Sequence, residues 1–527
     1  MTNKAYTVQT AQIALIVALG GFLMGFDASV ISGVVKFIEA EFALTKIQLG
    51  WAVASLTLTA TLGMMVSGPL SDKFGRKPVL KGAALLFFVS ALGSAFAPDY
   101  TTLVIARMVG GLGVGAALII APMYIAEVSP AHLRGRLVSM NQLNIVIGIS
   151  VAFFSNYLIL KLGSSESSWV ATLGLEKWQW RWMLGIEALP ALLYFIFLFR
   201  VPESPRWLVA QGRQSEAKQT LSRINSDEDA ERELLQIEEH LKKDEKESNV
   251  SLVEKLKNLL HPRLRFVLFI GLSVSVIQQL TGINAVFFYA PMIFEQSGIG
   301  TDASFLQAIA VGLTNLVFTF VAIYLIDKVG RKLLLVVGLA GIAISMFSLS
   351  HGFGSATYQI TPETYQTLPN EIKIPEIQAL QGEVFDNDLA FKSKLRETLG
   401  EARFIQYESA LLTAAITMNK NQILFSIIGF VACFAFSLGP IMWVLFSELF
   451  PNYIRGVAIS FVGLVNSGVS FGVQLIFPWE LANLGNAMTF LLYGMVAVIG
   501  LGIIIKWLPE TKGLSLEELE DHLVNNR

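Results

Sequence analysis

Long apolar stretches, separated by short polar segments, dominate the hydropathy pattern of this chain. Each stretch holds about 20 residues, enough for a helix to cross a hydrocarbon layer of about 30 Å. We predict twelve transmembrane helices, near 12–34, 49–70, 80–98, 101–125, 138–160, 182–200, 264–290, 306–326, 333–352, 421–447, 456–478 and 486–508. The pattern therefore predicts an all-α integral membrane protein.

The composition and the placement of charge agree with a membrane location. Hydrophobic residues make up 53% of the chain and charged residues only 15%, whereas soluble domains have about 25% charged residues. Basic residues fall in alternate short loops, namely Lys73, Arg76, Lys77, Lys81, Arg134, Arg136, Lys328, Arg331, Lys332 and Arg455. The positive-inside rule places these loops and both termini in the cytoplasm.

We expect a bacterial inner membrane, because the outer loops lack an Asn-x-Ser/Thr acceptor for glycosylation. We expect no nucleic-acid partner, because the basic residues form no single patch.

Three motifs occur twice along the chain. SDKFGRK (71–77) is echoed in YLIDKVGRK (324–332), AEVSPAHLRG (126–135) in SELFPNYIRG (447–456), and VPESPRWL (201–208) in LPETKGL (508–514). Such a repeat predicts duplication, with six helices in each half and a pseudo-twofold axis along the membrane normal. The predicted domains are a six-helix half (1–201), a cytoplasmic helical linker (202–262), a second six-helix half (263–510) and a cytoplasmic tail (511–527).

The second half carries a polar insertion at about 351–420, on the outer side. It mixes proline with polar and charged residues and has a helix-like part near 389–418. It is either a lid over the outer vestibule or a spacer, and we favour the spacer because long external loops usually tolerate insertions. The charged linker segment SDEDAERELLQIEEHLKKDEKE is interpreted as solvated amphipathic helices rather than as a partner-binding surface.

Several motifs occur together in one order: GPLSDKFGRKP, RMVGGLGVG, PMYIAEVSPAHLRGR, PESPRWL, QQLTGIN, DKVGRK, GPIMW with SELFP, and PETKG. In this order they resemble the sugar porter family of the major facilitator superfamily, over all twelve predicted spans. The resemblance implies the major facilitator fold and a transporter that exposes a central site alternately to each side by rocking its halves. It also implies a monosaccharide, hexose or pentose, as substrate. A lipid-embedded monomer is the expected state.

Charged residues of the repeated motifs lie at the cytoplasmic membrane edge. They are Asp72, Arg76, Glu127 and Arg134 in the first half, and Asp327, Arg331, Glu448 and Arg455 in the second. Glu127 and Arg134 lie seven residues apart, as do Glu448 and Arg455, and such ion pairs would close an inner gate at the seam between the halves. The alternative is that the basic loops only fix orientation. We favour the gate, since orientation does not require the repeated acids.

A sugar site needs uncharged side chains that donate and accept hydrogen bonds, together with an aromatic surface. Amides in apolar spans supply the first, at Gln142, Gln278, Gln279, Asn284, Asn315 and Asn466, and Trp443 supplies the second. Hydrogen bonding between helices is the structural alternative for each amide. The resemblance places Gln278, Gln279 and Asn284 on the family's sugar-binding helix and Gln142 on its fifth helix. Ser467 replaces a tryptophan found in many relatives, so the sugar itself stays open.

The glycines of RMVGGLGVG, at 110, 111, 113 and 115, are spaced somewhat like those of a nucleotide-binding loop. No strand precedes them, and they lie within an apolar span. Close packing between helices is therefore the better interpretation.

Asp27 is a lone carboxylate inside the first apolar span. It lies about 24 Å along the helix from Ala11, and Arg107 in the fourth span reaches nearly the same depth. A lone charge in the bilayer costs roughly 2.5–3.5 kcal/mol on insertion scales, so the two residues either pair or Asp27 takes up a proton. In the family, an aspartate at this point marks proton symporters. We favour a proton-coupling site at Asp27 modulated by Arg107, and a permanently ionised structural pair is the alternative.

The predicted function is secondary active import of a monosaccharide with protons. A passive sugar or polyol facilitator is the alternative, and a transporter-like sugar sensor is more remote, because only a short tail follows Trp507. We expect no enzyme activity, metal or cofactor. The histidines at 132, 240, 261, 351 and 522 form no pair at metal-ligand spacing, and the single cysteine, Cys433, can form neither a disulfide framework nor a cysteine metal site within the chain.

Overall fold

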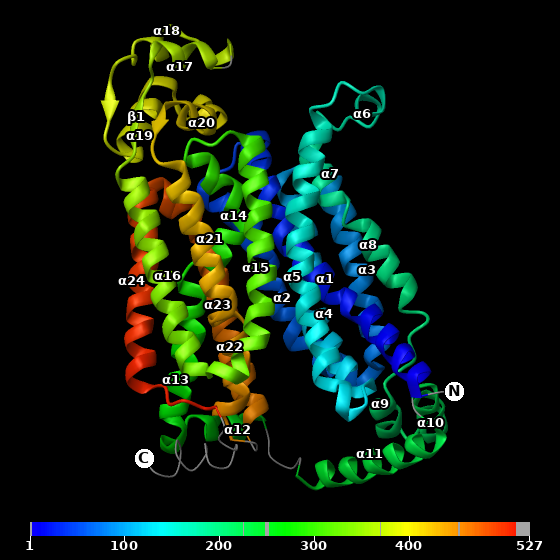
Figure 1. The fold of residues 1–527 in the computed structure, drawn as a ribbon. Coiled ribbons are helices and arrows are strands. Elements are labelled where there is room, and N and C mark those ends of the chain that lie inside the picture. Colours follow the sequence, from blue (N-terminus) through cyan, green and yellow to red (C-terminus); the bar gives the residue numbers. More distant parts are fainter. Residues whose placement is uncertain (1–2, 225, 248–251, 369, 452–453, 513–527) are drawn as a thin grey trace. The chain divides into compact units, whose positions relative to one another are not determined.

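A computed structural model gives the fold and describes residues 3–224, 226–247, 252–368, 370–451 and 454–512 (Figure 1). Within these residues, 12 helices are long and apolar enough to cross a membrane, as predicted. Most of the predicted tail, from residue 513 onward, lies outside the described residues.

The first six spans and the linker are helical. The spans are α1 (Asn3–Glu41), α2 (Lys46–Phe74), α3 (Arg76–Ala95), α4 (Tyr100–Val128), α5 (Ala131–Gly163) and the pair α7 (Gln179–Gly185) and α8 (Ala188–Phe197), with the short α6 (Ser168–Thr172) between α5 and α7. The segment predicted as a linker contains α9 (Pro205–Ala210), α10 (Gln214–Ile224), α11 (Asp227–Glu247) and α12 (Leu252–Leu259).

The second six spans begin after a short 3-10 turn, η1 (Pro262–Leu264). They are the pair α13 (Arg265–Leu280) and α14 (Ile283–Gln296), α15 (Thr301–Val329), α16 (Arg331–Gly354), the pair α21 (Lys420–Phe436) and α22 (Leu438–Leu449), α23 (Arg455–Asn483) and α24 (Gly485–Trp507). α16 packs against α21 and α24.

Two of these spans are broken where hydropathy predicts continuous helices. Gly282 separates α13 from α14 in a left-handed conformation with φ of 87°, which a glycine adopts without the penalty of a Cβ. Ser437 separates α21 from α22, just before Pro440, with φ of −123° and ψ of −96°. Each break interrupts the helical hydrogen-bond ladder, so polar side chains nearby have backbone partners inside the membrane.

The chain forms two compact units, each with segments from several parts of the sequence. The first unit comprises Met1–Val30, Ser55–Ala152 and Arg181–Leu256, and the second comprises Ile31–Ala54, Phe153–Trp180 and Lys257–Arg527. One end of each of α1, α2 and α5 thus packs with the second unit. The division into halves at 1–201 and 263–510 stays a prediction.

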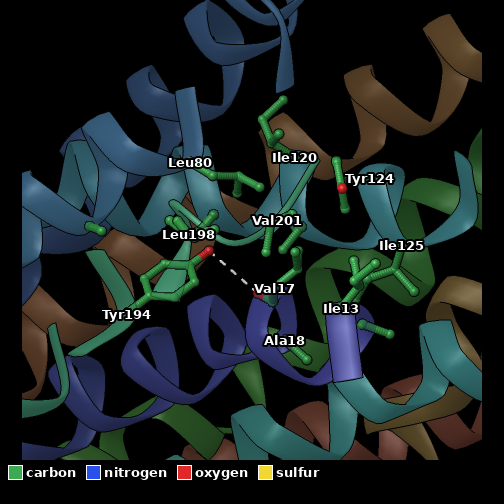
Figure 2. Packing of buried hydrophobic residues seen from close by; sticks show 14 of the residues in the cluster. Ile13, Val17, Ala18, Leu80, Ile120, Tyr124, Ile125, Tyr194, Leu198 and Val201 are labelled. Atoms are coloured by element: carbon green, nitrogen blue, oxygen red, sulfur yellow. Dashed lines mark hydrogen bonds between the residues drawn. The ribbon is translucent and has the colours of Figure 1, made fainter. Parts of the chain in front are cut away.

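Apolar side chains of α1, α3, α4 and α8 interlock in the core of the first unit (Figure 2). Tyr194 on α8 is fully buried, and its hydroxyl donates to the carbonyl of Val17 at 3.4 Å. Gly20 makes this approach possible, because a Cβ there would lie 2.8 Å from the Tyr194 hydroxyl oxygen. The core thus fixes α1, which carries Asp27.

The insertion between α16 and α21 is a folded subdomain. It contains β1 (Thr357–Gln359), α17 (Pro362–Thr367), η2 (Asn370–Ile372), α18 (Pro375–Gln378), β2 (Val384–Phe385), α19 (Asp388–Leu399), α20 (Glu401–Ala415) and β3 (Ile416–Thr417). Its strands form an antiparallel sheet in the order β2-β1-β3, with Tyr358 opposite Phe385 and Ile416. Figure 1 shows it at the ends of α16, α21 and α24, which we call the insertion side. The prediction of an all-α membrane fold with twelve spans is confirmed, and the short strands that the structure describes are confined to this insertion.

The subdomain has its own apolar core. Tyr358, Phe391 and Phe404 are buried at its centre, and the Tyr358 and Phe391 rings stack with centroids 5.5 Å apart. α19 and α20 match the helix-like part predicted near 389–418. A hydropathy profile does not reveal such a core, because its apolar residues come from short elements spread over a polar segment.

Candidate functional site

Asp27 and Arg107 form a buried ion pair within the first unit. The Oδ1 atom of Asp27 lies 3.3 Å from the Nη1 atom of Arg107, and the side chains are only 3% and 2% exposed. α1 and α4 bring the two together at the shared depth expected from sequence. The second carboxylate oxygen, Oδ2, has no hydrogen-bond partner among the described residues. A buried carboxylate with one oxygen unsatisfied is poised to accept a proton or a water molecule.

Glu187 is a second buried acid at this site, and it is absent from the predicted site residues. It lies between α7 and α8, is 3% exposed, and interacts electrostatically with both Asp27 and Arg107. Its Oε1 atom also has no hydrogen-bond partner among the described residues. Two carboxyl groups and one guanidinium carry one excess negative charge when all are ionised. The sequence contained a feature that could have predicted this residue, because Glu187, like Asp27, is an acid inside an apolar span.

Gly110 on α4 makes room for the Asp27 carboxylate. A Cβ at Gly110 would lie 2.8 Å from Asp27 Oδ2 and still closer to the hydroxyl of Ser90. The neighbouring glycines serve helix packing, as predicted: a Cβ at Gly115 would collide with the backbone of α2, and one at Gly113 would lie 3.0 Å from the carbonyl oxygen of Ala83 on α3. Only Gly110 contacts the buried acid directly.

We expect Gly110→Ala to weaken proton-driven accumulation, because the added methyl group displaces the Asp27 carboxylate. Gly82→Ala is the matched control, since nothing lies within 4 Å of a Cβ built there. The accumulation ratio under a fixed pH gradient measures the effect in proteoliposomes. Equal ratios in the two variants would show that the Gly110 contact is irrelevant to coupling.

An amide network lies at the break between α13 and α14, within the second unit. Gln279 Nε2 donates to Gln278 Oε1 and to Asn466 Oδ1, both at 3.1 Å, and Gln279 Oε1 accepts from Asn284 Nδ2 at 2.8 Å. Asn466 Nδ2 donates to Gln278 Oε1 at 2.8 Å and to the Ser275 carbonyl at 3.0 Å. Gln278 Nε2 donates to the Leu438 carbonyl beside the α21–α22 break. Four of the predicted sugar-binding amides therefore form one cluster.

The cluster continues towards the insertion side through two residues that the sequence analysis did not name. Ser470 Oγ accepts from Asn284 Nδ2 at 2.6 Å and from Gln474 Nε2 at 2.8 Å. The Tyr289 hydroxyl donates to the Gln474 carbonyl at 3.0 Å. Ser470 and Gln474 recur four residues apart after Asn466 on α23, a helical spacing that was visible in the sequence.

The other predicted sugar-binding residues lie apart from this network. Asn315 is 7% exposed on α15, and no hydrogen bond joins its side chain to the cluster in the described parts of the chain. Trp443 on α22 is 48% exposed and packs edge-on against Phe446, at a centroid distance of 5.9 Å. Gln142 is exposed on α5 and belongs to the first unit. The side chains of Trp443 and Gln142 are thus exposed, whereas those of the cluster are buried or, for Asn284, half-buried.

The repeated motifs of the first unit form a charged network around Arg76. Its guanidinium is bound at two points by Glu127, with Nε to Oε2 and Nη2 to Oε1 both at 3.0 Å. Nη1 also reaches Asp72 Oδ1 at 3.0 Å. Glu203, from VPESPRWL, accepts from the backbone N–H groups of Arg76 and Lys77. Burial raises the pKa of Glu203, although its hydrogen bonds with backbone N–H groups oppose that rise.

The second unit repeats this arrangement around Arg331. Its Nη2 atom lies 2.8 Å from Glu448 Oε1. Glu510, from LPETKGL, accepts from the backbone N–H groups of Arg331 and Lys332 at 2.9 and 3.1 Å. Glu203 and Glu510 thus cap the helices that begin at the two arginines, a role the sequence analysis missed although the third repeat pointed to both residues.

The seven-residue spacing suggested the wrong partners for two acids. Arg134 Nε donates to the Ala126 carbonyl and Arg455 Nε to the Phe450 carbonyl, each at 3.0 Å, while Glu127 and Glu448 bind Arg76 and Arg331. The reason is geometric, because the helix that carries each acid ends before the arginine seven residues later, α4 at Val128 and α22 at Leu449. The networks that the structure describes also join helices of one half, not the two halves. The Asp327 side chain lies outside the described part of the chain.

Glu127→Ala is expected to destabilise the protein by about 3 kcal/mol, since it leaves a buried guanidinium short of its main partner. The Arg76 and Glu127 side chains are 10% and 9% exposed. Asp72→Ala removes another partner of Arg76 but should cost less than about 1 kcal/mol, because Asp72 is 73% exposed. Thermal unfolding in detergent compares the two. Similar losses would show that Glu127 is not the main partner of Arg76.

Comparisons with known proteins agree with these features. The chain matches the family described as "Sugar (and other) transporter" at residues 13–364 and 403–523. It is 34% identical over 508 residues to the arabinose-proton symporter of Bacillus subtilis, covering 96% of this chain and 94% of the relative. It is 35% identical over 540 residues to the D-xylose-proton symporter of Escherichia coli K12, with the same coverage of each. The inward-open structure of the E. coli xylose transporter XylE matches with a TM-score of 0.73 at 33% identity, covering 98% of this chain and all of XylE.

This family consists of transporters rather than enzymes, and its fold supplies the twelve spans seen here. The agreement covers both sets of repeated motifs, the three amides of QQLTGIN and the span that carries Asp27. The chain is therefore a multi-pass membrane protein that belongs to the sugar porter family of the major facilitator superfamily, with the major facilitator fold.

Proposed function

We propose that this protein imports a monosaccharide together with protons by alternating access. The buried Asp27–Arg107 pair carries the proposal, since its side chains are almost fully shielded and one carboxylate oxygen has no partner among the described residues. The names of two relatives, an arabinose-proton and a D-xylose-proton symporter, support the same coupling. Pentoses and hexoses are the proposed substrates.

The proton has a clear electrostatic reason to bind here. With Asp27, Glu187 and Arg107 all ionised, a buried site holds one uncompensated negative charge, which is costly in a low-dielectric surrounding. A proton on either acid removes that excess charge. Water reaching the site in another conformation would stabilise both carboxylates and release the proton. One proton per cycle follows from this charge count.

The sugar is proposed to bind at the amide network around Gln279. In the present state Gln278, Gln279, Asn284 and Asn466 satisfy one another, so a sugar hydroxyl must replace some of these bonds. Such exchange is nearly neutral in energy when each amide regains a partner. We propose that accessible Trp443 stacks against the apolar face of the sugar and that Gln142 and Asn315 complete the site.

The charged networks around Arg76 and Arg331 are each proposed to hold the helix ends of their own unit together on the motif side, the membrane side opposite the insertion. Following the positive-inside rule, we propose that this side and both termini are cytoplasmic, and that the insertion side faces out from a bacterial inner membrane. A monomer suffices for the mechanism, because every proposed site residue belongs to one chain.

Uptake in proteoliposomes tests the proposed function. Radiolabelled xylose, arabinose, glucose, galactose and fructose are offered with and without an inward proton gradient, and exchange is measured separately as counterflow. Accumulation that requires the gradient is the expected result for at least one sugar. Counterflow without gradient-driven accumulation would identify a facilitator, and no flux of any sugar would refute a sugar substrate.

A further inference from the structure

The insertion is firmly anchored to α23 and α24. Asp388 Oδ2 accepts from the Asn486 backbone N–H at 3.3 Å and from its Nδ2 at 3.1 Å. Lys392 Nζ donates to Asp388 Oδ2 at 3.0 Å and to the Leu481 carbonyl at 3.3 Å. All three polar side chains are buried, so this attachment excludes water. The subdomain therefore moves with these two helices.

A second attachment joins α20 to the end of α14. Ser409 Oγ donates to Glu295 Oε2 at 2.9 Å, and Thr413 Oγ1 donates to the Glu295 carbonyl at 3.1 Å. Lys420 Nζ, at the start of α21, donates to the Gly298 carbonyl at 2.5 Å. Together with the first attachment, these bonds make the insertion a rigid extension of the second set of six spans.

The same insertion also reaches helices of the first set of spans, at the ends that belong to the second unit. Lys46 Nζ, at the start of α2, lies 2.8 Å from Glu408 Oε2 on α20 and 2.7 Å from Glu39 Oε1 on α1. The Lys46 and Glu408 side chains are 15% and 11% exposed. Burial alone would raise the pKa of Glu408, but the ammonium groups of Lys46 and Lys392 hold it below its usual range.

A parallel pair lies next to this one. Lys36 Nζ on α1 lies 2.9 Å from Glu295 Oε1, the acid that also holds Ser409 of the insertion. Both pairs line one cavity of ≈ 90 Å³ between α1, α14 and α20. The cavity has room for a few water molecules. Such waters can solvate the charged side chains of both ion pairs once the pairs separate. The ion pairs can therefore break and form again.

Close packing accompanies the ion pairs. The Trp51 ring on α2 meets the Phe471 ring on α23 edge-on at 5.7 Å, and Gly50 lies directly against the Leu475 carbonyl. α2 cannot move away from α23 while these contacts and the Lys46–Glu408 pair persist. Within the second unit, the insertion-side end of α2 is therefore held against α20 and α23.

We propose that the insertion is a gate of the transport cycle and that Glu408 is its gating residue, holding α2 through Lys46 whenever the insertion side is closed. The proposal rests on the alternating access inferred above. Opening of the insertion side then requires the Lys46–Glu408 pair to separate. It replaces the spacer interpretation, under which the insertion would contact only the helices that it connects. The family match omits residues 365–402, within the insertion, but includes both Lys46 and Glu408.

Reversible cross-linking tests whether Lys46 and Glu408 must separate during transport. In a Cys433→Ser background, which removes the single native cysteine, Lys46→Cys and Glu408→Cys are joined by a short bifunctional methanethiosulfonate in proteoliposomes. We expect sugar counterflow to be lost on cross-linking and restored by reductant. The control joins Lys394→Cys to Glu397→Cys, an exposed pair inside the subdomain, and should keep its counterflow. Unchanged counterflow in the cross-linked 46–408 protein would overturn the proposal.

A distance measurement keeps the test independent of the substrate. Spin labels at Ile47→Cys and Arg403→Cys report the separation of α2 from α20 by double electron–electron resonance. We expect Glu408→Gln to increase the long-distance population roughly tenfold over Glu397→Gln, since it removes a contact made only in the closed state. Identical distance distributions in the two variants would refute the gate. This readout needs no sugar, so absence of flux in every protein would count against the proposed function and not against the gate.

Discussion

Asp27→Asn is expected to abolish sugar accumulation driven by a pH gradient while leaving counterflow in place. Asparagine keeps the size of the side chain and can still accept a hydrogen bond from Arg107, whose Nη1 lies 3.3 Å from Asp27 Oδ1. It can no longer bind and release a proton. The protein then still exchanges sugar across the membrane, but the proton gradient can no longer drive sugar accumulation.

The expected size of this effect follows from the coupling ratio. If one proton moves with each sugar, a gradient of one pH unit is worth about 1.4 kcal/mol and supports roughly tenfold accumulation. The Asp27→Asn protein should instead reach equal concentrations on both sides. Asp302→Asn is the control, because that aspartate is 55% exposed on α15, where it pairs with Lys161. Accumulation by Asp27→Asn equal to that of the control would make the buried pair purely structural.

Glu187→Gln extends the same measurement to the second buried acid. If the site holds one shared proton, removing this carboxyl group removes the excess negative charge that favours protonation. Accumulation should therefore weaken, although Asp27 remains in place. Normal accumulation would show that Glu187 has no part in coupling.

Gln279→Ala is expected to have the largest effect on apparent sugar affinity. Gln279 donates to Gln278 and Asn466 and accepts from Asn284, so its truncation removes three hydrogen bonds of the network and leaves the buried Asn466 Oδ1 without its donor. Each unsatisfied buried group costs about 1–3 kcal/mol, which corresponds to a loss in affinity of roughly 10- to 100-fold for a sugar that bonds to these groups. Half-saturation of counterflow and direct binding both measure the loss.

The matched control is Gln422→Ala. Gln422 on α21 also joins two helices through its amide, because its Nε2 donates to the Ser348 carbonyl on α16 at 2.9 Å. It is not part of the amide network around Gln279. This control should lower the melting temperature without changing affinity. If Gln279→Ala behaves in the same way, the network only holds helices together, which is the structural alternative for membrane amides.

The spans follow from the sequence because a bilayer imposes a one-dimensional rule. About 20 apolar residues must be helical to satisfy their backbone in hydrocarbon, whatever their neighbours are. That rule gave all 12 spans. It could not place the breaks at Gly282 and Ser437, since hydropathy carries no information on backbone dihedrals. The glycine of QQLTGIN and the proline of GPIMW were the available signals.

The sequence by itself determined the number of spans, the internal duplication, the depth shared by Asp27 and Arg107, and the presence of amides with sugar-binding chemistry. Only the tertiary structure decided which side chains pair with one another. It added Glu187 to the buried pair, joined Glu127 to Arg76 instead of Arg134, and folded the insertion so that Glu408 meets Lys46. The physical reason is that burial and depth are local properties of a segment in a membrane. Ion pairs and hydrogen bonds instead depend on which helix faces meet, and residues far apart in the chain settle that.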